Sequence, residues 1–314
     1  MGDNRPFDVL VAGEINPDLI LADSDLTVRF SQHEALVDSA TMTIDSSAAI
    51  FACGAARLGL KVAFIGVVGD DFFGHFMLES LTARNVDVSN VIVNPALDTG
   101  LSVILSRGVD RAILTHMGAM NALRADDIPD SLLAQARHFH VTSYFLQTAL
   151  QPDLPALFAR ARGLGLSTSI DTNWDPEERW TGVDAVLEET TIFLPNDAEA
   201  LALTGAATVG EAARQLATKA DTVAVKLGGD GALTCAGEGI TRAAAIPIAV
   251  ADTVGAGDTF DAGFVYGYLH GWDASASLQL GIACGSLSTR EAGGVNAQPT
   301  LDEANFARDN HKTH

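Results

Sequence analysis

Short apolar runs rich in valine, isoleucine and leucine alternate along this chain with longer segments of helical composition. A continuous apolar run of about four to eight residues is typical of a parallel strand that is buried on both faces. Such runs lie at residues 9–12, 62–68, 139–142, 167–171, 191–194 and 222–226. Helical stretches lie between them at residues 48–58, 72–84, 153–164, 198–203 and 210–218. The alternation predicts a three-layer α/β fold, with a mostly parallel central sheet and helices on both faces.

Two segments, residues 19–42 and 91–114, interrupt this alternation with short stretches in which apolar and polar residues alternate. That pattern indicates short antiparallel strands, which would form a small β lid over one end of the sheet. We expect the lid within about residues 14–45 and 91–115. The sequence contains no internal repeat and no linker rich in proline or serine, so we expect a single domain over residues 1–314.

The charge balance is strongly acidic. The 314 residues carry a net charge of −21, and the 40 acidic residues are spread along the sequence. Such a chain repels nucleic acids and anionic membrane surfaces, so neither is an expected partner. A bound nucleotide would have to be held by local backbone amides, a few cations and metal ions.

Cysteine usage and the N-terminus indicate the compartment. Cys53, Cys235 and Cys284 stand in small apolar surroundings without a CxxC pair, as expected of buried thiols under reducing conditions. The sequence shows no signal-peptide pattern and no run of roughly 18 uninterrupted apolar residues. We therefore expect a cytoplasmic protein.

The most informative segment is DTVGAGD at residues 252–258, which leads directly into a helix that runs to about His270. A glycine-rich turn that enters a helix points backbone amides and the positive end of the helix dipole at one place, where an anionic phosphate can bind. Asp258 lies in the first turn, where a carboxylate could take the proton from an attacking hydroxyl during phosphoryl transfer. Alternatively, Asp258 only complements the helix dipole and the glycines only permit tight packing.

This segment resembles the C-terminal signature of the ribokinase-like, or PfkB, carbohydrate kinases. Three further segments resemble that family in the same order: GVVGDDFFG at residues 66–74, LPNDAEA at 194–200, and VKLG at 225–228 with Gly231 and Ala232 after it. The resemblance implies a ribokinase-like fold and transfer of the γ-phosphate of ATP to a hydroxyl of a sugar or sugar-like molecule. Within it, Asp258 is the expected base, and the amides of Gly255, Ala256 and Gly257 form the expected anion hole.

The resemblance also implies a set of nucleotide and metal contacts. Asn196 and Glu199 would hold magnesium and the ATP phosphates, through water, although Asn with Glu three residues later is also a helix capping box. Lys226 would lie near the nucleotide, or on the surface with its stem packed on the sheet. The further residues expected near the nucleotide are Gly228, Gly231, Thr253 and Ser288. Asp252 and Thr253, with the turn at residues 291–294, resemble the family's monovalent-cation region, which makes potassium a candidate.

On the substrate side, Asn16 and Asp18 follow the first strand and match family positions that bind sugar hydroxyls; alternatively they form an ordinary Asn-Pro-Asp turn. The chain departs from the family at residues 44–50, where Asp45 and Ser46 replace a glycine pair and Ile50 stands where asparagine is usual.

Ribose is therefore a less favoured substrate. Asp45 and Ser46 would contact a hydroxyl or cap the following helix. Asn173 matches a cleft position of the family, and Arg111, Phe145 and Trp174 are further pocket candidates.

Two alternatives to a sugar kinase remain at this point. One is a nucleoside kinase of the same fold, in which lid aromatics would stack on a base. The other is a non-catalytic sensor that binds a sugar or nucleotide, suggested by the altered segment at residues 44–50. The lid is also a candidate surface for a homodimer.

Overall fold

A nine-stranded sheet forms the centre of the described chain, which in this computed structural model comprises residues 5–107, 110–237 and 239–311. Residues 108 and 109 of the expected lid, and the two ends of the expected domain, lie outside these ranges. The strand order is β15-β14-β13-β12-β11-β10-β1-β4-β6. The strands are β1 (Phe7–Ala12), β4 (Val62–Ile65), β6 (Val86–Asp87), β10 (Ala136–Thr142), β11 (Ser167–Asp171), β12 (Ile192–Phe193), β13 (Thr222–Lys226), β14 (Ala232–Ala236) and β15 (Gly239–Ala243).

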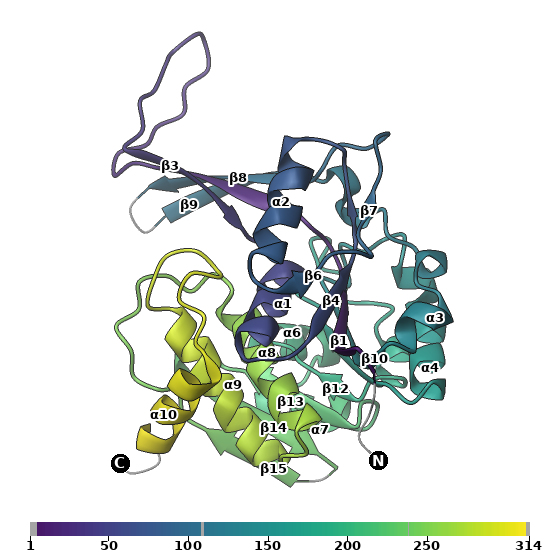
Figure 1. Cartoon of the computed structure of the whole chain (residues 1–314). Coiled ribbons are helices and arrows are strands. Elements are labelled where there is room, and N and C mark those ends of the chain that lie inside the picture. Colours follow the sequence, from purple (N-terminus) through teal and green to yellow (C-terminus); the bar gives the residue numbers. More distant parts are fainter. Residues whose placement is uncertain (1–4, 108–109, 238, 312–314) are drawn as a thin grey trace.

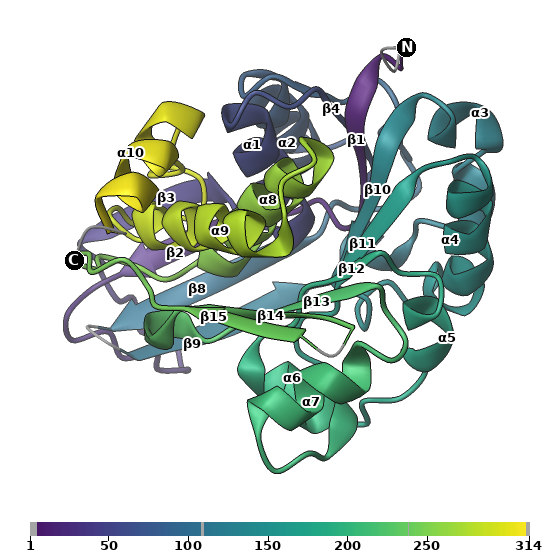
Figure 2. The same ribbon diagram turned by 90° about the horizontal axis from the view of Figure 1, so that it is seen from below.

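The pairing from β6 to β13 is parallel, and β14 and β15 add an antiparallel edge. Helices cover both faces of this sheet, as Figure 2 shows. One layer contains α1 (Ser47–Arg57), α2 (Phe72–Thr82), α8 (Ala256–Leu269), α9 (Ala274–Ser288) and α10 (Leu301–His311). The other contains α3 (Asp130–Leu133), α4 (Leu154–Gly163), α5 (Asp184–Leu187), α6 (Asp197–Thr204) and α7 (Val209–Leu216). The predicted three-layer α/β fold is thus confirmed.

Two apolar clusters, one on each face of the sheet, form the core. Phe51, Phe64 and Phe264 are fully buried in the cluster under α1, α8 and α9, and Phe139 and Phe158 are fully buried in the cluster under α4. The buried runs of β1, β4 and β13 are continuously apolar, as expected of strands covered on both faces, whereas β10 and β11 also bury polar side chains such as His138, His140 and Ser169. Within the described ranges, no helix is long and apolar enough to cross a membrane.

A separate four-stranded sheet in the described chain lies over one end of the central sheet, in the order β3-β2-β8-β9 (Figure 1). Its strands are β2 (Pro17–Ala22), β3 (Ser39–Ile44), β8 (Leu101–Arg107) and β9 (Asp110–His116). The outer pairs are antiparallel, as expected, but β2 and β8 pair in parallel. We call this sheet, with the connection 23–38 that projects from it in Figure 1, the lid. β5 (Val67–Val68) and β7 (Ile92–Val93) form a separate small parallel pair.

Candidate active site

A cavity of about 850 Å³ opens at the carboxyl ends of β11, β12 and β13. In the sheet, β4 and β6 follow on one side of β1, and β10 to β13 follow on its other side. The direction in which successive strands are placed therefore reverses between β1 and β10. Ligands of open α/β sheets bind at the carboxyl ends of the strands near such a reversal. Strand ends contribute Asp171, Asn196 and Lys226 to the cavity wall, and the lid contributes Arg111.

The N-terminus of α8 forms another wall. Gly255, the N-cap, has φ of 69°, and a Cβ on it would lie 2.9 Å from both Gly294 Cα and Ile50 Cγ2. This position therefore requires glycine. The Ala256 amide donates to Thr253 O at 3.2 Å, whereas the amides of Gly257 and Asp258 have no protein acceptor among the described residues. Two first-turn amides are thus free for an anion at the positive end of the helix.

Asp258 is the third residue of α8 and is buried at the cavity wall. Burial, together with the nearby carboxyl group of Asp171, raises its pKa to about 8, and Lys226 opposes this shift. Ser47, at the start of α1, hydrogen-bonds to the carboxyl group. A carboxyl group with a pKa near the working pH is suited to accept a proton from an alcohol and to release it afterwards.

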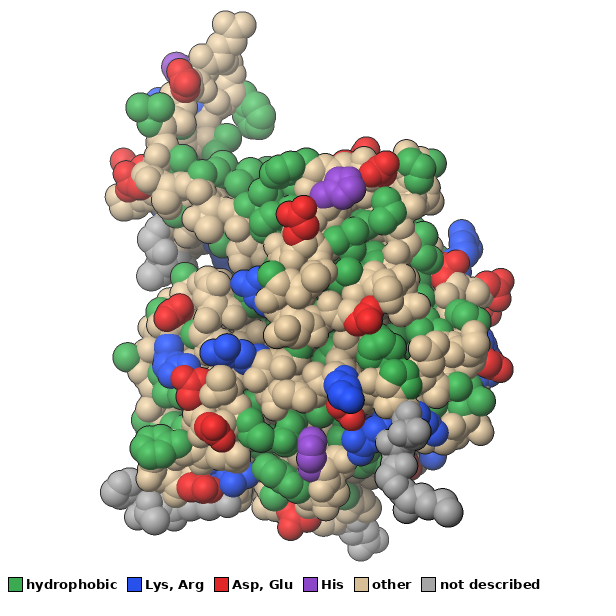
Figure 3. Space-filling view, viewed as in Figure 1, with side chains coloured by type: hydrophobic (Ala, Val, Ile, Leu, Met, Phe, Trp, Pro, Cys, Tyr) green, Lys and Arg blue, Asp and Glu red, His purple; other side chains and the backbone are tan. Residues whose placement is uncertain are grey.

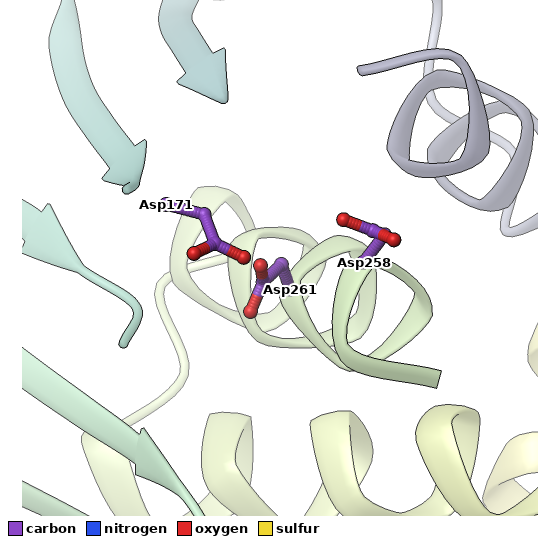
Figure 4. A group of neighbouring side chains, drawn as sticks. All are labelled: Asp171, Asp258 and Asp261. Carbon is purple, nitrogen blue, oxygen red and sulfur yellow. The ribbon is translucent and has the colours of Figure 1, made fainter. Parts of the chain in front are cut away.

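A buried ion cluster lies beside Asp258. Lys226 Nζ donates to Asp171 Oδ2 at 2.7 Å and to Asp261 Oδ2 at 3.1 Å. Figure 4 shows the carboxyl groups of Asp171, Asp258 and Asp261 gathered at one side of α8. Burial alone would lower the pKa of Lys226, but Asp171, Asp261 and Glu199 outweigh it and raise that pKa, so the ammonium group is charged. Lys226 is therefore a buried part of the site and not a surface residue.

Asn196 and Glu199 begin α6 and line the same cavity. Asn196 Oδ1 accepts from the Glu199 amide at 2.8 Å, and Glu199 Oε2 accepts from the Asn196 amide at 2.9 Å, so the capping box is present. Burial, with Asp171 nearby, raises the pKa of Glu199 to about 7. Magnesium prefers oxygen ligands and keeps several waters. The donor set of Asn196 and Glu199, at the cavity wall, fits a magnesium ion held through water.

The substrate side is built from the chain around β2 and α1. Asn16 and Asp18 are buried but are not among the described residues that line the cavity, and burial raises the pKa of Asp18 and that of Asp45, the latter to about 10. Asn173, with φ of 52°, donates through Nδ2 to Ser47 Oγ and to Ser143 Oγ, both at 2.8 Å. These bonds hold Asn173 at the cavity wall, next to the start of α1.

The sequence matches the description "pfkB family carbohydrate kinase" over residues 7–301. The chain belongs to the PfkB carbohydrate kinase family. A 2-dehydro-3-deoxygluconokinase from Bacillus subtilis is 32% identical, with coverage of 80% of this chain and 82% of the relative. An ATP-dependent ribose-1-phosphate kinase from Halopiger xanaduensis is 30% identical, with 94% and 95% covered. The crystal structure of a putative ribokinase II from E. coli, in complex with ATP and Mg²⁺, superposes with a TM-score of 0.85 at 25% identity and covers 97% of this chain and all of that one.

The protein is therefore an ATP-dependent carbohydrate kinase with a ribokinase-like fold. Most of the residues expected around the nucleotide line the cavity, namely Asn196, Glu199, Lys226, Gly228, Gly231, Thr253, Ala256, Gly257 and Asp258. Ser288 is an exception, because it is buried in α9 and donates to Gly285 O at 2.9 Å. Ser286 and Thr289, on the side of α9 that faces the cavity, line it instead.

Other expected pocket residues have structural roles in this kinase. Ser46 is the N-cap of α1 and accepts from the Ala49 amide at 3.3 Å. Ile50 is buried and packs against Gly255 and Gly294. It therefore helps to fix the glycine turn at the start of α8. Phe145 and Trp174 pack edge-on against Trp180 and are not among the described residues that line the cavity.

Sequence reasoning missed an apolar wall and a buried acid. Residues 245–248, Val250, Phe260 and Ile282 line the cavity and give it an apolar wall of the kind on which an aromatic base can pack. The apolar run IPIAV at residues 246–250, just before DTVGAGD, was the available signal. Glu14, at the end of β1, is buried and accepts from Ser143 Oγ at 2.8 Å and Gln147 Nε2 at 3.2 Å. Burial raises its pKa above the usual range, and the hydrogen bonds from Ser143 and Gln147 oppose this shift.

Proposed function

We propose that Asp258 takes the proton from the acceptor hydroxyl of the sugar while that oxygen attacks the γ-phosphorus of ATP. The new bond joins the sugar oxygen to phosphorus, the bond from phosphorus to the β,γ-bridging oxygen breaks, and ADP leaves. The proposal rests on one observation: Asp258 lies on the same helix end as the two free amides, within one cavity. Proton acceptor and anion site are thus adjacent.

The surrounding residues divide the remaining tasks. The amides at the start of α8 would bind the transferring phosphoryl group as its negative charge shifts, in the manner of an oxyanion hole. Asn196 and Glu199 would hold magnesium through water, and the bound ion neutralises phosphate charge. Lys226 lies next to Gly257, because a Cβ built on Gly257 would be 3.5 Å from Lys226 Nζ. The ammonium group of Lys226 would thus place a positive charge beside the anion hole.

Replacing Asp258 with Asn tests the assignment. Asparagine preserves the shape but does not accept the proton, so turnover should fall by at least about a thousandfold, within the range lost when such groups are removed. ADP release from ATP and magnesium would be measured across sugars, sugar acids, sugar phosphates and nucleosides, and nucleotide affinity by calorimetry. Affinity for ATP should stay near that of the natural protein.

The matched control is Asp38→Asn, which removes an exposed carboxylate from the lid and should leave turnover unchanged. If Asp258→Asn kept more than a tenth of the natural turnover, the assignment of the base would be wrong. If turnover and ATP binding were lost together, Asp258 would have a structural role instead.

The remaining question for this function is which molecule accepts the phosphate. Relatives are named for deoxygluconate derivatives and for ribose 1-phosphate, and these names do not agree on one acceptor. A nucleoside acceptor would need aromatic side chains on the lid side. Among the described residues that line the cavity, the aromatic one is Phe260, which lies on α8. These observations support a sugar or related polyol.

We also propose that potassium orders the segment that precedes the anion hole. Asp252 accepts from the Val254 amide at 3.1 Å and from the Gly293 amide at 3.0 Å, so its carboxylate already joins this segment to the turn at residues 291–294. A cation next to these segments would hold Gly255 in place. Turnover in potassium should exceed turnover in N-methylglucamine at equal ionic strength; equal rates would contradict the proposal.

The lid carries the apolar surface that would support a homodimer. On the connection 23–38, Val28, Phe30 and Leu36 are exposed by 57%, 91% and 84%, and on β9 Ile113 and Leu114 are also exposed. Figure 3 shows apolar side chains on this projecting part of the molecule. We propose that a second copy covers this surface. The mass in solution tests this, and a monomer at micromolar concentration would contradict it.

A cytoplasmic location fits the chemistry of the chain. Cys53, Cys235 and Cys284 are free and buried, as is usual in a reducing compartment. The kinase also requires ATP, which supports the same location. Fractionation of cells that produce the protein would test this proposal, and recovery outside the cytoplasm would contradict it.

A further inference from the structure

A chain of hydrogen bonds joins Glu14, just after β1, to the start of α1. Ser143 Oγ donates to Glu14 Oε1 at 2.8 Å, and both side chains are buried. Asn173 Nδ2 donates to Ser143 Oγ and to Ser47 Oγ, both at 2.8 Å. Ser47 in turn hydrogen-bonds to the carboxyl group of Asp258. We call the first four residues the positioning chain, and its last bond reaches the group that we assign as the base.

The donors and acceptors fix the direction of these bonds. The hydroxyl, side-chain amide and backbone amide groups that bond to Glu14 in the described structure all donate, so its carboxyl group acts as an acceptor. A hydroxyl group has one hydrogen, so Ser143, which gives its hydrogen to Glu14, must accept from Asn173. The second hydrogen of the Asn173 amide is given to Ser47 Oγ. The Ser47 hydroxyl hydrogen then remains for Asp258.

The two middle residues of the positioning chain have strained backbones. Ser143 and Asn173 have φ of 53° and 52°, in the left-handed region that residues with a Cβ rarely adopt. Ser143 directly follows β10 and Asn173 follows β11, and these strands are parallel neighbours. Strain of this kind persists only where the surrounding structure determines the conformation, and it is concentrated at functional sites. It is expected here if the hydrogen bond between the two side chains serves the reaction.

Most of the positioning chain lies behind the cavity wall. Asn173 and Asp258 line the cavity, whereas Glu14, Ser47 and Ser143 are not among the described residues that line it. We propose that the positioning chain aims the Ser47 hydroxyl at Asp258 and so holds that carboxylate in the orientation in which it accepts the proton. Side chains locked by such bonds preserve the reactive geometry without touching the substrate. This inference rests on the proposed role of Asp258 as the base.

Two variants break the chain at different points. Ser143→Gly removes the hydroxyl that links Asn173 to Glu14, and glycine adopts the left-handed backbone of this position without strain. Ser47→Ala removes the donor to Asp258 itself. Each should lower kcat by about tenfold and leave KM for ATP within about twofold, because neither residue lines the cavity.

These constants would be measured by ADP release with the compound that is turned over fastest among the sugars, sugar acids, sugar phosphates and nucleosides. Circular dichroism and ATP affinity by calorimetry would show that each variant is folded. Should Ser143→Gly not fold, Ser143→Ala makes the same break.

The pH profile separates positioning from a merely structural role. Burial raises the pKa of Asp258, and the hydrogen bond from Ser47 lowers it. Loss of this bond should therefore move the midpoint of kcat/KM upward by about one pH unit in both variants. Both variants retain the charged groups that act on Asp258, which are Glu14, Asp45, Asp171, Lys226 and Asp261. The control is Ser131→Ala, at an exposed serine of α3, which should leave kcat and the midpoint unchanged.

A double variant tests whether the two serines act through one chain. If Ser143 and Ser47 act on the same contact, the double variant should have a kcat within about threefold of Ser47→Ala alone. Independent effects would multiply to a loss of about a hundredfold. Ser47→Thr retains a hydroxyl group and should keep kcat within about threefold of the natural protein.

An unchanged midpoint in Ser143→Gly, or a hundredfold loss in the double variant, would overturn the inference and leave the kinase function intact. Equal losses in Ser47→Thr and Ser47→Ala would overturn it as well, because the hydroxyl would then have no role. If folded natural protein that binds ATP phosphorylates none of the compounds, the proposed function fails, and the inference fails with it.

Discussion

Two acidic groups flank Asp258, and they differ in how their charge is balanced. On the nucleotide side, Asp171 and Asp261 hold Lys226 between them, with the Lys226 side chain 12% exposed. On the substrate side, burial raises the pKa of both Asp18 and Asp45, and Arg111, an exposed residue on the lid, opposes these shifts. The first group has its hydrogen bonds complete within the protein. The second retains free acceptors.

The group around Lys226 is therefore a fixed part of the site, whereas the group around Asp18 and Asp45 can take hydrogen bonds from a ligand. A buried ion pair with short hydrogen bonds holds its geometry whether or not a ligand is bound, which is what a phosphate-binding wall requires. Buried oxygens without hydrogen-bond donors lower the stability of the unliganded protein. They favour binding of a substrate whose hydroxyl groups supply the missing donors. We therefore expect the substrate side to determine which acceptor is selected and the nucleotide side to carry out the phosphoryl transfer.

The largest expected effect follows from removing the lysine. Lys226→Met would leave Asp171 and Asp261 buried without a cation, which should lower the free energy of unfolding by about 3–5 kcal/mol. Arg111→Met, on the substrate side, should lower it by less than about 1 kcal/mol because Arg111 is exposed. Urea denaturation of both variants checks the comparison. Similar losses would show that the two acidic groups do not differ in the way the contacts indicate.

The nucleotide side was largely predictable from sequence, because local chemistry determines it. A glycine-rich turn before a helix predicted the start of α8, and Asn196 with Glu199 predicted the capped start of α6, since both features depend on neighbours within a few residues. Ser288 was misplaced next to Ser286 and Thr289 because small residues in a buried helix give no periodic signal for the face that meets the cavity.

The substrate side was harder to predict. Asn16, Asp18 and Asp45 were candidates, but the close approach of Asp45 to Asp18 and the position of Arg111 depend on the pairing of β2 with β3 and on the place of β9 in the lid. These contacts join residues that are far apart in sequence. The role of Ile50 under Gly255 depends likewise on α1 packing against α8.

An effect of intermediate size is expected in the dependence of kcat/KM on pH. The pKa of Asp258 is raised to about 8, and its deprotonated form is the base. Therefore kcat/KM, which reports on the free enzyme, should rise about tenfold per pH unit below pH 8 and level off above it. Activity measured from pH 6 to 9.5 in buffers of constant ionic strength checks this. A profile that is flat below pH 8 would mean that Asp258 already carries its full charge at neutral pH.

The smallest expected effect is on the stability of the substrate side. The pKa of Asp45 rises from 3.8 to about 10 on folding, so between these values the folded protein binds more protons than the unfolded chain. Stability then falls as pH rises through this window, because the unfolded state is favoured once its carboxyl group can ionise. Asp45→Asn removes this ionisation from the unfolded chain, and at pH 8 the variant should be more stable than the natural protein by about 1 kcal/mol or more.

This gain should grow between pH 5 and pH 9, and Asp38→Asn, at an exposed carboxylate, should show none. Denaturation at several pH values therefore measures how much the raised pKa of Asp45 changes the stability of the unliganded protein. A loss of stability in Asp45→Asn, or a gain that does not depend on pH, would mean that the Asp18–Asp45 pair is satisfied without a ligand. The substrate side would then resemble the Lys226 cluster, and the contrast between the two acidic groups would have to be abandoned.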